Sequence, residues 1–129
     1  MTRRLFILAL LMVAAACGSS QVAPEDRPRT RSDRLTQEEI LRTQMSSMFD
    51  VVQRLQPGWL IPQRERGLPS PIGVFMDGVR VGNADFLRQI PSSQVSEARF
   101  LSNRDVAAEL TRSQQTGIGS AIMLTSRRQ

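Results

Sequence analysis

The sequence predicts an α+β domain over residues 35–129, on three observations. Apolar residues recur at helical spacing through residues 35–56, as on one face of an amphipathic helix. Two strand-like runs meet at Asp77-Gly78, a dipeptide typical of a tight two-residue hairpin. A last apolar run, residues 121–125, follows a glycine-bearing turn. We therefore expect one long N-terminal helix, a small mixed sheet of about four short strands, and two short helices.

Residues 1–16 have the pattern of a signal peptide. Arg3 and Arg4 precede twelve uninterrupted apolar residues, 5–16. As a helix this run would span about 18 Å, which is too short for a hydrocarbon core of about 30 Å. Its length is instead typical of the apolar region of an export signal. The alternative, a buried core helix, is weak because a helix that is apolar on every side would sit beside a polar stretch.

The residues Ala14-Ala15-Ala16-Cys17-Gly18 resemble the lipobox of bacterial lipoproteins. The resemblance implies a diacylglycerol on Cys17, cleavage before it and an acylated new N-terminus. Ala14 departs from the leucine that is commonest there, and an ordinary secretory signal with an incidental cysteine is the alternative. Gly18 is not the aspartate associated with inner-membrane retention. The expected location is the cell envelope, lipid-anchored to the outer membrane and facing the periplasm.

After the lipidated cysteine, residues 17–34 are expected to form a flexible linker, because they hold Pro24, Pro28 and few apolar side chains. A helix over residues 35–56 should follow. Thr36 and Glu39 have the spacing of a capping box, and Pro57-Gly58 ends the helix. The apolar stripe is expected to pack on the chain's own sheet, with a coiled coil to a partner as the alternative.

The remaining elements are short. Trp59 is expected to close over the core, with a place at an interface as the alternative. Residues 64–71 are mostly polar and are expected to form a loop. The later strands and helices are expected, in order, as a strand at 72–76, a strand at 79–81, a helix at 84–90, a strand at 95–101, a helix at 105–110, a turn at 114–119 and a strand at 121–125.

The order of these elements resembles the plug domain of TonB-dependent outer-membrane receptors. The resemblance covers residues 71–128 and is carried by the segments at 74–79, 87–91, 95–101 and 119–127. It departs at Leu110-Thr111, where plugs often carry Tyr-Gly, and at Gly119-Ser120, where paired glycines are usual. No barrel follows the plug-like region, so the resemblance implies the fold and not receptor transport.

The composition removes much of ordinary catalytic chemistry. The chain has no histidine, a single cysteine and 17 basic residues that are all arginine, against 12 acidic ones. Imidazole bases, Ser-His-Asp triads and Cys-x-x-Cys zinc sites are therefore excluded. Asp105 and Glu109 stand four apart on a predicted helix and are expected to be solvated. Gly117-Ile118-Gly119 precedes a strand instead of opening a helix, so a dinucleotide loop is not expected.

These observations favour a membrane-anchored lipoprotein whose plug-like domain is a non-catalytic protein-binding or structural module. We expect no enzyme activity, cofactor, bound metal or nucleic-acid partner; the partners would be a membrane, through the lipid on Cys17, and another envelope protein such as a receptor or secretion component. The alternative is a periplasmic small-ligand carrier or sensor, or an accessory to TonB-dependent uptake. An enzyme would need Asp105, Glu109 and a third carboxylate to converge.

Overall fold

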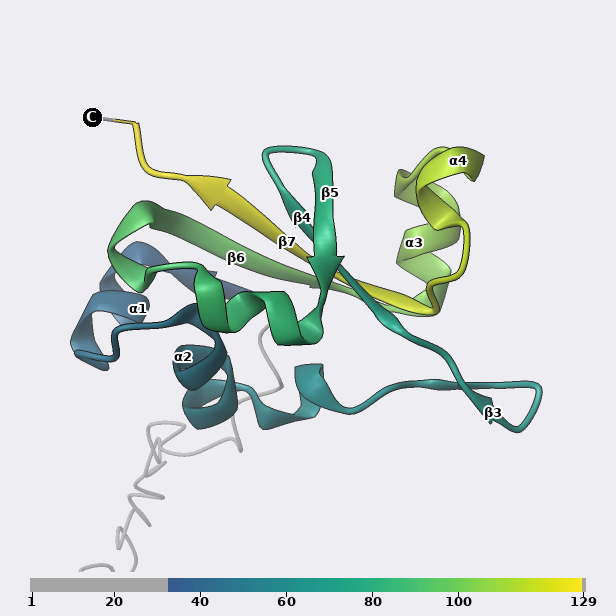
Figure 1. Cartoon of the computed structure of the whole chain (residues 1–129), viewed down its shortest axis with the longest axis horizontal. Helices are drawn as coiled ribbons and strands as arrows, with labels where there is room; N and C mark the ends of the chain where they lie inside the picture. Colours follow the sequence, from purple (N-terminus) through teal and green to yellow (C-terminus); the bar gives the residue numbers. More distant parts are fainter. Residues whose placement is uncertain (1–32, 129) are drawn as a thin grey trace, which may run out of the picture.

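A computed structural model describes residues 33–128 as a small α+β fold around a five-stranded mixed sheet (Figure 1). The sheet order is β1-β6-β7-β4-β5, with β4 and β7 parallel and every other neighbouring pair antiparallel. Its strands are β1 (Arg34–Thr36), β4 (Ile72–Met76), β5 (Val79–Asn83), β6 (Val95–Leu101) and β7 (Ser120–Ser126). Two further strands, β2 (Arg64–Glu65) and β3 (Leu68–Pro69), pair only with each other.

The helices within residues 33–128 are all short. They are α1 (Gln37–Arg42), α2 (Met48–Leu55), α3 (Asn103–Glu109) and α4 (Arg112–Gln115), with 3₁₀ helices η1 (Pro57–Leu60), η2 (Ala84–Gln89) and η3 (Ser92–Gln94). None of the helices within residues 33–128 is long and apolar enough to cross a membrane. The predicted signal peptide, Cys17 and most of the predicted linker lie outside the described residues.

The prediction of one long helix over residues 35–56 was wrong. Its capping box is confirmed, with Thr36 as N-cap and Glu39 at the third helical position, but α1 ends at Arg42. Gln44 then has a left-handed φ of 54°, which a continuing helix does not allow. Ser47 starts α2 as a new N-cap, accepting a hydrogen bond from the Asp50 amide. The apolar spacing is continuous across the break, so the periodicity alone did not reveal it.

The larger of two apolar cores lies between one face of the sheet and the helices α1, α2, η1 and η2. Alternate residues of the central strands point into it, including Val74, Ala98, Ile122 and Leu124, each at most 2% exposed. The apolar stripe of the N-terminal region, with Ile40, Met48, Val51 and Val52, fills the other side. The stripe thus packs against the chain's own sheet, as the sequence predicted.

A second, smaller core lies on the opposite face, under α3. Phe75, Leu101 and Ala121 come from the sheet, Val106 and Leu110 from α3 and the residue after it, and Ile118 from the segment that leads into β7. Neighbouring residues of one strand, such as Val74 and Phe75, therefore serve opposite cores. Because β4 and β7 are buried on both faces, they carry nearly continuous apolar runs.

The count of about four strands was also too low. The sequence did not predict β1, the β2–β3 pair or α4, and it read residues 64–71 as an irregular loop. The strand β1 pairs through three residues with β6, and only Leu35 of the three is buried. A strand that short has too few residues to show an alternating pattern.

Candidate interaction site

The turn at Asp77-Gly78 is held firmly at one end of the sheet. Both residues have positive φ, 49° and 83°, as a type I′ turn requires. The Asp77 amide donates to the Leu124 carbonyl at 2.9 Å, and the Ser126 amide donates to Asp77 Oδ1 at 2.9 Å. Hydrogen bonds from the side chain and the backbone of Ser126 hold the pKa of Asp77 below its ordinary value of 3.8. The two residues thus tie the β4–β5 hairpin to the end of β7.

The other side of this hairpin rests on α4 and the residue after it. Gln114 Nε2 donates to the Gly78 carbonyl at 3.0 Å, and Arg80 Nη1 donates to the Thr116 carbonyl at 2.9 Å. Both bonds join residues 36 positions apart in the chain. The turn is therefore supported from β7 and from α4 together, which makes the end of the β4–β5 hairpin a well-defined surface.

The strand β5 forms an open edge of the sheet, since within residues 33–128 it pairs only with β4. Met76 and Val79 flank the two-residue turn and form a hydrogen-bonded pair, so the backbone N–H and C=O of the next residue, Arg80, point to the open side. The side chain of Val79 is 67% exposed. Farther along, the register shifts between Val74 and Phe75, and this bulge ends the regular edge before Gly82.

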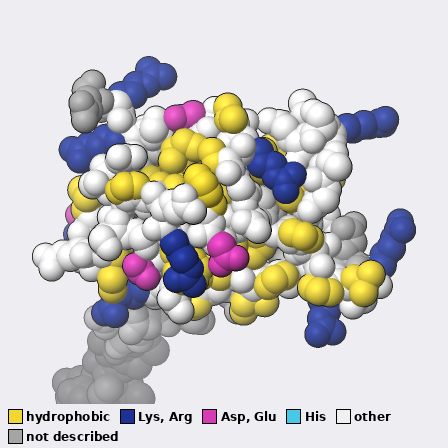
Figure 2. Space-filling model, in the orientation of Figure 1, with side chains coloured by type: hydrophobic (Ala, Val, Ile, Leu, Met, Phe, Trp, Pro, Cys, Tyr) yellow, Lys and Arg dark blue, Asp and Glu magenta, His cyan; other side chains and the backbone are white. Residues whose placement is uncertain are grey.

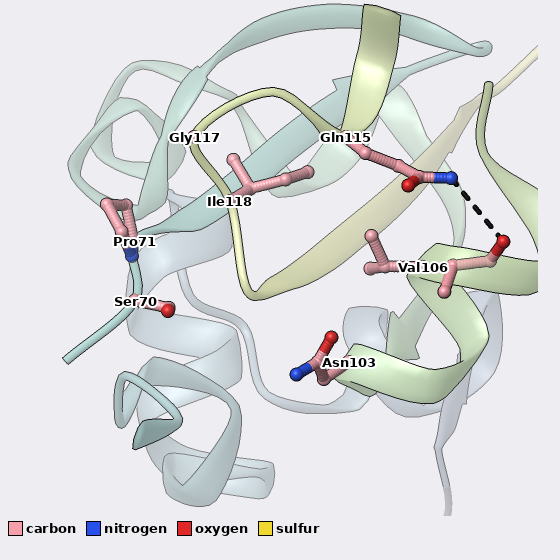
Figure 3. Close-up of a pocket in the computed structure, with 8 residues that line it drawn as sticks. Ser70, Pro71, Asn103, Val106, Gln115, Gly117 and Ile118 are labelled. Carbon is pink, nitrogen blue, oxygen red and sulfur yellow. Dashed lines mark hydrogen bonds between the residues drawn. The ribbon is translucent and has the colours of Figure 1, made fainter. Parts of the chain in front are cut away.

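A polar cleft of about 420 Å³ lies on the α3 side, between α3, the segment before β4 and the segment before β7 (Figure 3). Its lining residues are Ser70, Pro71, Asn103, Val106, Ala107, Gln115, Gly117 and Ile118. The Asn103 side chain is directed into the space between α3 and Ser70 (Figure 3). Gln115 Nε2 donates to the Leu110 carbonyl, which leaves its carbonyl oxygen for other donors. The lining is neutral, so the cleft offers hydrogen bonds without charge.

The structure places the other predicted site residues as follows. Trp59 is 3% exposed and stacks on Phe100, with ring centroids 5.7 Å apart, so its indole is part of the core and is not available at the surface. Asp105 accepts hydrogen bonds from the Ser102 backbone amide and hydroxyl, which lower its pKa below 3.8. Glu109 forms an ion pair with Arg99. Asp105 thus caps α3, and Glu109 joins α3 to β6.

Chemistry-bearing side chains do not gather in the described part of the chain. No group of three His, Cys, Asp or Glu residues within residues 33–128 could hold a metal ion. The sequence did not predict the open edge of β5 or the polar cleft, because each is formed by segments far apart in the chain. Comparison of the chain with models of known protein families and with curated proteins finds no match.

Proposed function

We propose that this chain is a lipid-anchored, non-catalytic module of the cell envelope, whose plug-like domain binds another envelope protein through the open edge of β5. The single observation that carries the proposal is this edge, with an outward-facing backbone at Arg80 beside the exposed side chain of Val79. Exposed edges bind extended peptides by main-chain hydrogen bonds, while alternate side chains provide specificity.

Two features favour β5 over β1, which is the other edge of the sheet. First, β1 has three residues against five in β5, and α1 begins directly after it. Second, the turn next to Val79 is held from β7 and α4, so its strand loses little conformational freedom when a partner binds. The bulge after Arg80 limits pairing to a short segment, which suits a specific contact better than open-ended association.

The edge can be tested by site-specific photo-crosslinking in intact envelopes. A photoreactive residue at position 79 should give a discrete adduct with one protein, whereas the same residue at position 41, where Leu41 is 45% exposed, should not. Arg80→Pro removes the outward N–H and should abolish the adduct. Arg80→Ala keeps that N–H and should retain it, while circular dichroism checks that both variants fold. Equal adducts at both positions, or an adduct insensitive to Arg80→Pro, would contradict binding through this edge.

The anchor needs a separate measurement, because it rests on residues outside the described region. Mass spectrometry of the mature N-terminus should find Cys17 carrying diacylglycerol and an acylated amine, and Cys17→Ser should release the protein from membranes. An unmodified N-terminus at another residue would remove the anchor from the proposal and leave the edge-binding part to stand alone.

The polar cleft favours a second candidate, a periplasmic carrier or sensor of a small neutral ligand. Its Asn103 and Gln115 amides could recognise a neutral polar molecule over the apolar Val106 and Ile118. A true ligand should raise the melting temperature of the wild-type protein and not of Asn103→Leu. If ligands from a broad screen shift both proteins alike, or neither, the cleft is not a specific site.

A further inference from the structure

Two exposed apolar side chains lie on the β2–β3 hairpin and on the segment that leads to it. Ile61 is 65% exposed and Leu68 is 72% exposed, and they are two of four large hydrophobic residues with high exposure in the described part of the chain. None of residues 61–71 belongs to either apolar core. These two side chains therefore lie outside both cores of the domain.

Two arginines accompany these side chains. Arg64 and Arg66 are exposed, and neither forms an ion pair with a side chain that the structure describes. Figure 2 shows hydrophobic side chains in a row along the lower right of the molecule, where Figure 1 places this hairpin, with basic side chains projecting beside them. Aliphatic and cationic groups thus share one end of the protein.

The hairpin is fixed at its base and projects beyond it (Figure 1). The Ser70 amide donates to the Gln63 carbonyl at 2.8 Å, and the Gly119 amide donates to the Pro71 carbonyl at 2.9 Å. At the tip, Arg66 and Gly67 have φ values of 49° and 84°, so the chain reverses within two residues. The result is a narrow convex element and not a groove.

The shape and chemistry fit a fluid bilayer surface better than a folded partner. A convex tip can bury its apolar side chains in fluid lipid, which adapts to its shape. Protein interfaces instead depend on side chains that fill preformed pockets. The hairpin carries Arg64, Glu65 and Arg66, a net charge of +1, which favours anionic over neutral lipid head groups. We infer that the β2–β3 hairpin is a membrane-contact element, with Ile61 and Leu68 entering the interfacial layer and Arg64 and Arg66 binding anionic head groups.

This inference does not require the lipid on Cys17, and it can be tested without it. Residues 17–129 with Cys17→Ser retain every residue of both cores, which lie within residues 35–124. The protein should co-sediment with vesicles made of equal parts phosphatidylcholine and phosphatidylglycerol. Leu68→Asp should lower the partition coefficient about ten-fold. Leu41→Asp is the matched control, because Leu41 is 45% exposed in α1, outside both the hairpin and the proposed β5 edge, and it should leave binding unchanged.

The contribution of the two arginines to vesicle binding is tested with a matched pair of double variants. Arg64→Glu with Arg66→Glu should reduce binding to the anionic vesicles by more than about ten-fold. Arg104→Glu with Arg112→Glu makes the same change in net charge at exposed positions of α3 and α4 and should have a much smaller effect. On vesicles of phosphatidylcholine alone, both double variants should bind as weakly as the unsubstituted protein.

The inference fails if the protein does not bind the anionic vesicles, or if hairpin and control variants bind alike. Equal binding of the hairpin and control variants would show that the net charge of the protein or the linker arginines cause the vesicle binding. These outcomes are distinct from failure of the proposed edge or the proposed anchor, because the vesicle assay contains neither a protein partner nor a lipidated chain.

Discussion

Two hairpins in the described part of the chain have the same local turn but different surroundings. Asp77-Gly78 joins β4 to β5 and Arg66-Gly67 joins β2 to β3, and in both a residue with φ of 49° is followed by a glycine near 83°. The strand β4 has Val74 and Phe75 fully buried, whereas every described residue from Arg64 to Pro69 is exposed. A turn of this kind reverses the chain in either setting. Burial of the flanking strands decides whether the hairpin belongs to the core or projects from it.

The largest contrast should come from removing one apolar side chain of each hairpin. Phe75→Ala leaves a cavity in the smaller core and should lower the free energy of unfolding by about 3–5 kcal/mol. Leu68→Ala should change it by less than about 0.5 kcal/mol, because Leu68 is 72% exposed. Urea unfolding followed by the fluorescence of the buried Trp59 measures both. Similar losses in the two variants would show that the β2–β3 hairpin is part of the cooperative unit.

A smaller contrast is expected from the two turn glycines. Both have positive φ and open space where a Cβ would stand, so alanine adds the same backbone strain, about 1–2 kcal/mol, at either position. Gly78→Ala should lower the free energy of unfolding by that amount. Gly67→Ala should lower it less, because the β2–β3 hairpin can relieve strain by opening locally while the cores stay folded.

Amide hydrogen exchange distinguishes the two cases for the glycine variants. Gly67→Ala should speed exchange only around residues 63–70, with the Ser70 amide as reporter, while Gly78→Ala should speed it through the sheet. Equal losses of global stability in the two variants would contradict local opening.

The smallest difference between the two hairpins is expected in the loss of stability at acid pH. Because the folded-state pKa of Asp77 is lowered by Ser126, its ionised form stabilises the fold above the unfolded pKa, and that contribution is lost as pH falls through the lower folded value. Asp77→Asn should therefore lose less stability than the wild type between about pH 5 and pH 2. Arg66→Asn, at the matching position of the other hairpin, removes no carboxylate and should keep the wild-type acid dependence. Thermal unfolding at a series of pH values measures the difference.

Some features of the chain were determined by the sequence alone, because their physics is local. The capping box at Thr36 and Glu39 depends on residues three apart, and the reversal at Asp77-Gly78 depends on two adjacent residues. The apolar runs of β4 and β7 likewise predicted two strands from the residues of each run alone. The lipobox around Cys17 remains a prediction from the sequence.

Tertiary structure decided the rest. The break between α1 and α2 occurs at Gln44, in the midst of a continuous apolar pattern, and Ser47 starts a new helix where the Met48 amide also bonds the distant Ile90 carbonyl at 2.9 Å. The open edge of β5 exists because β7 pairs on the other side of β4, which residues of β5 alone do not indicate. The exposure of Leu68 follows from the absence of any described segment that covers it. Each of these depends on contacts between residues far apart in the chain, and such contacts leave no periodic pattern in the sequence.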